Sequence, residues 1–101
     1  MISYKLILFT FFLQIASAFT ISGTIKDSKT GEPLPYTNIV ILGTDLGTAS
    51  DVNGYYILPG ISRGEFDIQF MIIGFSTLKK NIKIIDENIR VDVELNPKVI
   101  D

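Results

Sequence analysis

From residue 19 onward, apolar and polar positions alternate with the period of two that half-buried β-strands require. In the first such stretch, residues 19–26, Ile21 and Ile25 fall on one side of the strand and Gly23 falls with them. In the last, residues 89–95, aliphatic and charged residues alternate without an error. Helical spacing is hard to find in this part of the chain, so the pattern predicts a protein built from β-strands.

Clusters of Gly, Pro, Asn and Asp separate the alternating stretches and mark turns. The turn residues are Gly31, Pro33, Gly43, Asp51, Asn53, Gly54, Gly64 and Gly74. The strands predicted between the turns cover residues 19–26, 37–42, 47–50, 55–58, 65–73, 78–85 and 89–95, and the fourth is expected to stop at Pro59-Gly60. Seven short strands with turns every eight to twelve residues predict an all-β fold, a seven-stranded antiparallel β-sandwich with Greek-key connections.

The first eighteen residues follow a different pattern. Lys5 precedes the apolar run Leu6–Leu13, and the small residues Ala16 and Ala18 close the stretch. A positive start, a short apolar run and a small-residue exit are typical of a secretory signal peptide. A membrane-spanning helix needs about 20 apolar residues, more than this run supplies. We therefore expect an exported protein, cleaved between Ala18 and Phe19.

A chain of 101 residues is long enough for one domain. With a signal peptide at residues 1–18, the β-sandwich domain is expected at residues 19–96. Residues 97–101 are then a tail or a linker to a downstream region.

Strand parity leaves four apolar residues outside the predicted core. Successive side chains of a strand point to opposite faces, so each neighbour of a core-facing residue points outward. In the second and fifth predicted strands these outward residues are Val40, Leu42, Met71 and Ile73. Exposed apolar residues that cluster indicate contact with a partner. These four residues therefore form the candidate interaction patch.

The composition excludes several kinds of chemistry. The chain has no His, no Cys and no Trp, which removes Ser-His-Asp and Cys-His nucleophiles, His- or Cys-ligated metals, disulfides and a lipid-bearing Cys. Nine basic and eleven acidic residues give a formal net charge of -2 and no electrostatic footprint for nucleic acid. We expect a protein that is not an enzyme, binds no cofactor or metal and does not bind nucleic acid.

Two weaker hypotheses of ligand binding remain, one for calcium and one for a sugar. Asp51-x-Asn53-Gly54 imitates the start of a calcium loop, but position twelve of such a loop is Ser62, which cannot replace the closing carboxylate. A β-turn is therefore expected, with an Asp45/Asp51 site as the alternative. Tyr36, Tyr55 and Tyr56 could stack on a sugar ring, although the parity of Tyr56 favours the core.

The remaining charged residues are expected on the surface. The acidic pairs Asp86/Glu87 and Asp92/Glu94 fall in a turn and on the polar side of a strand. Lys79, Lys80 and Lys83 are expected to be solvated or to protect a sheet edge, with contact to anionic lipid as the alternative.

Short motifs in a fixed order, most of them built around turn residues, run along residues 20–95. They are Gly23–Asp27, Thr30–Pro35, Asn38-Ile39, Gly43-Thr44, Gly47-Thr48, Ser50–Tyr56, Gly64–Phe66 and Ile73–Phe75. In this series the sequence resembles the carboxypeptidase regulatory-like domain family. The resemblance implies a seven-stranded, transthyretin-like β-sandwich. The family usually has Gly or Ala near Tyr36 and Thr37, so a larger loop is expected there.

The resemblance leaves function open, because modules of this family accompany several kinds of protein. They follow the catalytic domain of secreted metallocarboxypeptidases, and in many Gram-negative bacteria they follow the signal peptide of TonB-dependent outer-membrane receptors. Since a predicted signal peptide adjoins the module here, the resemblance favours the N-terminal extension of such a receptor. It implies a non-catalytic interaction module at the periplasmic face of the outer membrane, with a protein partner such as the receptor plug or barrel, assisting nutrient uptake. The alternatives are a secreted carbohydrate- or ligand-binding module and the regulatory domain of a metallocarboxypeptidase.

Overall fold

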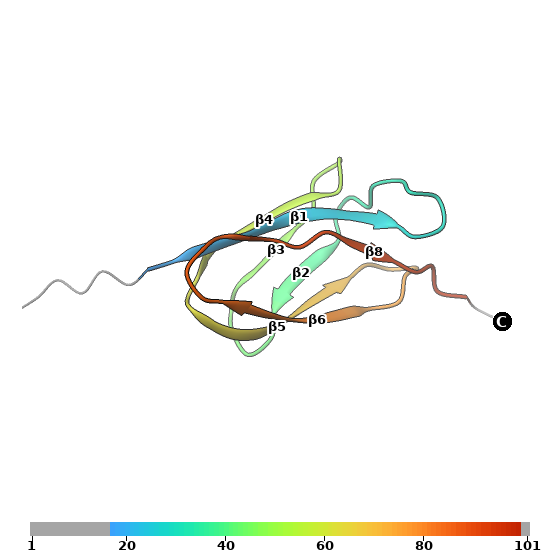
Figure 1. The fold of residues 1–101 in the computed structure, drawn as a ribbon. Coiled ribbons are helices and arrows are strands. Elements are labelled where there is room, and N and C mark those ends of the chain that lie inside the picture. The colour runs from blue at the N-terminus through green and yellow to red at the C-terminus, as the bar shows by residue number, and fades with distance from the viewer. Residues whose placement is uncertain (1–16, 100–101) are drawn as a thin grey trace, which may run out of the picture.

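The computed structural model describes residues 17–99, so most of the predicted signal peptide lies outside the described residues. The described part forms two four-stranded sheets that enclose one core (Figure 1). The strands are β1 (Phe19–Asp27), β2 (Asn38–Ile41), β3 (Gly47–Ala49), β4 (Tyr55–Ile61), β5 (Gly64–Met71), β6 (Leu78–Ile84), β7 (Ile89–Arg90) and β8 (Val93–Leu95). The predicted all-β sandwich is confirmed. Residues 17–99 contain no helix that is long and apolar enough to cross a membrane.

The two sheets differ in their pairing. The order β3-β2-β5-β6 is antiparallel throughout. In the other sheet β1 lies in the middle, antiparallel to β4 on one side and parallel to both β7 and β8 on the other. The sequence predicted antiparallel pairing everywhere, which is wrong for this edge. A period of two is common to both kinds of strand, so the pattern of residues does not distinguish them.

The predicted last strand, residues 89–95, is divided into β7 and β8. The interruption lies opposite Gly23, where a Cβ atom would collide with the carbonyl group of Val91. The Val91 amide donates to the Ser22 carbonyl at 2.8 Å, and Asp92 Oδ1 accepts from the Thr24 amide at 2.8 Å. The Asp92 side chain thus replaces a backbone acceptor where the ladder is broken.

Tyr56 binds the Val91 carbonyl beside Gly23. Tyr56 and Gly23 are cross-strand partners in the β1–β4 pair. The Tyr56 hydroxyl donates to the Val91 carbonyl at 2.7 Å. The Tyr56 ring packs edge-to-face against the ring of Phe70 in the opposite sheet, with 5.8 Å between the ring centroids. One buried side chain therefore joins β4, the β7–β8 interruption and the second sheet.

The core between the sheets follows the predicted parity of the strands. Ile21 and Ile25 of β1 are fully buried, as are Ile39 of β2 and Ile68 of β5. Thr37 and Ser50 are the buried polar residues among those described. The Ser50 hydroxyl donates to the Leu34 carbonyl at 2.7 Å and accepts from the Thr37 amide at 2.8 Å, so neither residue is buried without a partner.

Two predicted strand ends are wrong by more than one residue. β4 does not stop at Pro59 but continues to Ile61, with an irregular register between the pairs Phe19–Ile61 and Ile21–Leu58. Because β4 is an edge strand, a proline without an amide hydrogen and a bulge are both tolerated there. β5 ends at Met71 rather than at residue 73, and the next residues begin the loop to β6.

The sandwich has two ends, which we call the amino pole and the carboxyl pole. The carboxyl pole carries the loops of residues 28–37, 50–54 and 72–77 together with the segment 96–99 (Figure 1). The amino pole carries residues 17–18 and the loops of residues 42–46, 62–63 and 85–88. Since β1 and β8 are parallel, the described chain enters at one pole and leaves at the other.

The turn before β4 is fixed tightly to β1. Asp51 Oδ1 accepts from the amides of Asn53 at 2.9 Å and Tyr55 at 3.0 Å. Gly54 has a φ of 75°, and a Cβ atom there would lie 2.6 Å from the Ile25 carbonyl oxygen. Both the conformation and the lack of space therefore require glycine at this position.

We predict that Gly54→Val lowers the free energy of unfolding by about 3 kcal/mol, because about 1–2 kcal/mol of backbone strain adds to a clash with buried backbone. Gly31→Val is the matched control, since Gly31 has a φ of 76° and a Cβ atom there meets nothing within 4 Å. Urea unfolding of both variants separates the backbone strain, which both variants share, from the steric clash, which only Gly54→Val has. Equal losses at Gly31 and Gly54 would show that the close approach to β1 has no energetic weight.

Candidate interaction surface

The outer face of the sheet β3-β2-β5-β6 carries the predicted patch. Val40 lies opposite Gln69 and Asn38 lies opposite Met71 across the β2–β5 pair. Val40 and Met71 are therefore diagonal neighbours, a spacing of about 7–8 Å that long side chains can bridge. Leu42 extends the line by one more outward position, and its amide donates to the Asp67 carbonyl at 2.9 Å.

The four patch residues differ in how far they reach into solvent. Val40 is half-buried, whereas Leu42 and Met71 are each 37% exposed. Gln69 Nε2 contacts Met71 Sδ at 3.1 Å, which places a polar group directly beside the apolar line. Ile73, beyond the end of β5, is 98% exposed. The patch is thus a narrow apolar stripe that leads from β2 toward the loop of residues 72–77.

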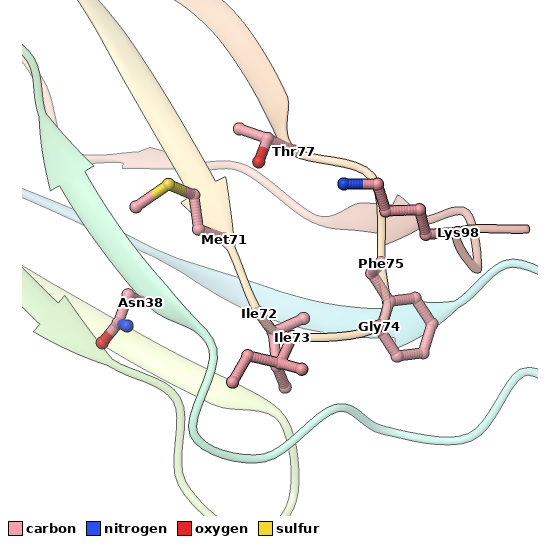
Figure 2. A pocket seen from close by; sticks show the side chains of 8 residues that line it. All are labelled: Asn38, Met71, Ile72, Ile73, Gly74, Phe75, Thr77 and Lys98. Atoms are coloured by element: carbon pink, nitrogen blue, oxygen red, sulfur yellow. The ribbon is translucent and has the colours of Figure 1, made fainter. Parts of the chain in front are cut away.

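At the carboxyl pole the stripe runs into a groove of about 590 Å³. Figure 2 shows side chains from β2, from the end of β5, from the loop to β6 and from the C-terminal segment around it. The lining residues are Asn38, Met71, Ile72, Ile73, Gly74, Phe75, Thr77 and Lys98. The parity of the strands indicated Met71 and Ile73, but no local pattern could join them to Lys98, which is more than twenty residues away in sequence.

The C-terminal segment forms one wall of the groove through backbone pairing. Phe75 and Pro97 form an antiparallel bridge. The Ser76 amide donates to the Asn96 carbonyl at 2.8 Å, and the Lys98 amide donates to the Gly74 carbonyl at 2.8 Å. The predicted tail thus begins as an ordered part of the sandwich, at least as far as Lys98.

The structure separates the residues of the weaker hypotheses of ligand binding. Asp45 and Asp51 lie at opposite ends of β3, and Asp51 Oδ1 is already occupied by two backbone amides. Within residues 17–99, no three acidic side chains come together in a way that could hold a metal ion.

Tyr56 does not share a surface with the other two tyrosines. Tyr56 is buried in the core, and Tyr55 points to the opposite face of β4. Tyr36 is exposed in the loop before β2, with a φ of 61° that is uncommon for a residue other than glycine. The backbone is therefore strained at the position where the family resemblance predicts a larger loop.

The charged side chains near β7 and β6 make local contacts. Arg90 Nε donates to Asp92 Oδ2 at 3.0 Å, and this hydrogen bond, assisted by bonds from Thr24, holds the pKa of Asp92 below its usual range. Lys83 lies 3.8 Å from Glu65, and Arg63 lies 3.6 Å from Asp86. All these groups are solvated, so the three ion pairs contribute little to stability.

Similarity to solved structures supports the fold alone. The major pilin subunit BcpA of Bacillus cereus superposes with a TM-score of 0.66 at 17% identity, over 81% of this chain and 31% of that one. A chain of a type II cohesin–X-dockerin complex from Acetivibrio cellulolyticus gives a TM-score of 0.64 at 18% identity, over 74% of this chain and 52% of that one. A catechol 1,2-dioxygenase variant from Acinetobacter radioresistens gives a TM-score of 0.64 at 12% identity, over 83% of this chain and 53% of that one.

Similarity in sequence is more specific. TonB-dependent receptor P3 of Formosa agariphila is 33% identical over 101 aligned residues, which cover 95% of this chain and 9% of that receptor. The chain therefore spans about a tenth of the length of the curated relative that it matches. The sequence model of the CarboxypepD_reg-like domain matches residues 21–101. This match extends from β1 through the groove-forming segment, and it shows that the chain belongs to the CarboxypepD_reg-like domain family.

Proposed function

We propose that this chain is an exported, non-catalytic interaction module of a TonB-dependent outer-membrane receptor, placed at the N-terminal end of the receptor on its periplasmic side. Its task is to dock a neighbouring part of the receptor, such as the plug, and so to assist nutrient uptake. The observation that carries the proposal is the 33% identity over 95% of the chain to a TonB-dependent receptor.

The surface of the module supports docking rather than catalysis. In the stripe, Val40 and Met71 lie on the regular outer face of a sheet, where the strand pairing holds side chains in register, and Leu42 follows directly after β2. Polar residues such as Gln69 and Asn38 border it. An apolar centre with a polar rim is the usual anatomy of a protein–protein contact.

The start of β1 supports export. Phe19 is the first residue of β1 and packs against the core, while Ser17 and Ala18 before it are exposed. Cleavage between Ala18 and Phe19 would therefore remove the preceding residues without loss of a strand residue.

We predict that the exported protein begins at Phe19. The small residues Ala16 and Ala18 fit the two positions that signal cleavage requires. Intact-mass measurement of the protein recovered from the periplasm or outer membrane tests this directly. A mature product that retains Leu6–Leu13 would contradict export by cleavage and would favour a membrane anchor.

We predict that the double change Val40→Thr and Leu42→Thr weakens docking but leaves the fold intact. Threonine keeps the β-propensity, and loss of roughly 100 Å² of apolar contact at about 25 cal/mol per Å² corresponds to about 2.5 kcal/mol. The measurement is nutrient uptake by cells that carry the full receptor, together with the melting temperature of the purified chain.

The matched control for this experiment is the double change Ile57→Thr and Ile85→Thr. Both isoleucines are exposed but lie away from the stripe, on the outer face of the other sheet and at the amino pole. Uptake should fall in the stripe variant alone. Unchanged uptake in both variants would contradict the docking role, and a lower melting temperature in the stripe variant alone would show that Val40 and Leu42 serve the core.

A further inference from the structure

The groove at the carboxyl pole is a preformed feature. Ile72 and Phe75 pack against the hydrophobic core, so the floor of the groove is fixed by the fold. The Phe75 amide donates to the Ile72 carbonyl at 3.2 Å, and the two bonds to the segment 96–98 hold the rim. A groove whose floor is already packed against the core needs less ordering when it binds a ligand, which favours affinity.

The size of the groove suits a small number of side chains. Its volume of about 590 Å³ lies within the range of roughly 300–1,000 Å³ in which most ligand pockets fall. Its apolar walls come from Met71, Ile73 and Phe75, and its polar groups come from Asn38, Thr77 and Lys98. Figure 2 shows the Lys98 side chain between those of Thr77 and Phe75, with its ammonium group facing the recess.

The charge around the groove is positive. Lys98 is the charged residue of the lining, and within residues 17–99 no carboxylate lies within 4 Å of its ammonium group. Lys79 lies on the same outer face, opposite Gln69, and is therefore a diagonal neighbour of Met71 across the β5–β6 pair. The acidic residues of this face lie farther toward the amino pole, where Glu65 pairs with Lys83. The groove is therefore complementary to a ligand that carries a carboxylate beside an apolar group.

The edges of the two sheets make strand addition a poor alternative. β3 has three residues, and β4 contains Pro59 and a bulge. β6, the longest remaining edge, carries Lys79 and Lys83 on the outer face and Lys80 in a core-facing position. Short strands, proline and inward-pointing lysine are the devices that prevent pairing with another chain. A partner is thus directed to side-chain insertion rather than to main-chain pairing.

We propose that the groove binds an extended peptide segment in which an apolar side chain enters between Met71 and Phe75 and a neighbouring carboxylate pairs with Lys98. This rests on the proposed function, which makes the segment a part of the same receptor. The Phe75–Pro97 bridge directs the outgoing chain along the rim of the groove. A segment tethered nearby is presented at an effective concentration on the order of millimolar, so a weak intrinsic affinity is sufficient for docking.

The test uses the purified chain and three blocked hexapeptides. The probe is Gly-Ile-Asp-Ile-Asp-Gly, and the controls are Gly-Ile-Lys-Ile-Lys-Gly and Gly-Ser-Asp-Ser-Asp-Gly. We expect the probe to shift the NMR amide resonances of residues 71–75 and 98, and to bind about tenfold more tightly than either control. Equal binding of all three peptides, shifts confined to other residues, or no binding at millimolar concentration would overturn the proposal.

Three variants separate recognition from general damage. Ile73→Asp should weaken binding of the probe about tenfold, because it replaces an exposed apolar wall by a like charge. Ile85→Asp makes the same change in another exposed isoleucine, at the amino pole, and should leave binding unchanged. Lys98→Glu should reverse the preference in favour of the lysine peptide. A loss of binding to both charged peptides in Lys98→Glu would contradict the charge pairing.

These measurements need no receptor, so they fail independently of the proposed function. Probe binding together with normal uptake in the stripe variant would retain the groove and reject the docking role. If the probe binds no more tightly than the control peptides but the stripe variant loses uptake, the docking role is retained and the groove is rejected as a binding site.

Discussion

The sandwich depends on the crossing of the Val91 carbonyl over Gly23. Any side chain at residue 23 would collide with this carbonyl, so the carbonyl occupies the position that a side chain would take, and Tyr56 is the cross-strand partner of Gly23. The Tyr56 hydroxyl gives the buried carbonyl its hydrogen bond at 2.7 Å. Burial, with the nearby Asp92 carboxylate as a smaller contribution, raises the pKa of Tyr56 far above its usual value, so the hydroxyl stays a neutral donor. The ring then contacts Phe70 of the other sheet.

This crossing also determines where the candidate binding groove lies. Beyond the interruption the chain resumes pairing with β1 as β8, with Ile25 opposite Val93 and Asp27 opposite Leu95. β8 therefore runs parallel to β1 toward the carboxyl pole and delivers the segment 96–98 to the loop after β5. One wall of the groove thus exists because the last strand is parallel to the first. The groove and the core are consequences of the same local geometry.

Period-two alternation was enough to predict the fold class and the core of β1, β2 and β5, because each of these strands has one buried face. It was not enough at three places. The regular alternation of residues 89–95 concealed the break, which is caused by Gly23 on another strand. Pro59-Gly60 predicted the end of a strand, although an edge strand tolerates both residues. Asp92 is solvated as the alternation predicts, but the alternation gave no sign that its carboxylate also accepts hydrogen bonds from Thr24.

Only part of the candidate surface could be predicted from the sequence. Parity predicted an outward position for Val40 and Leu42 of the second predicted strand and for Met71 of the fifth, and these side chains are half-buried or exposed, whereas Ile73 is exposed because it lies in the loop after β5. Lys98 could not be assigned to the same surface, because its position depends on the pairing of Pro97 with Phe75 across the end of the sandwich. Residues that are brought together by tertiary pairing between distant loops leave no periodic signal.

The most direct test of the central interaction is the free energy of unfolding of Tyr56→Phe, measured in urea beside Tyr55→Phe. Removal of the Tyr56 hydroxyl leaves the buried Val91 carbonyl without its donor, which costs about 1–3 kcal/mol. Tyr55 points to the solvent face of the same strand, so its loss of a hydroxyl should change stability by less than about 0.5 kcal/mol. We predict this difference between the two variants. Equal stability of Tyr56→Phe and the unchanged protein would contradict the central role of the crossing at Gly23.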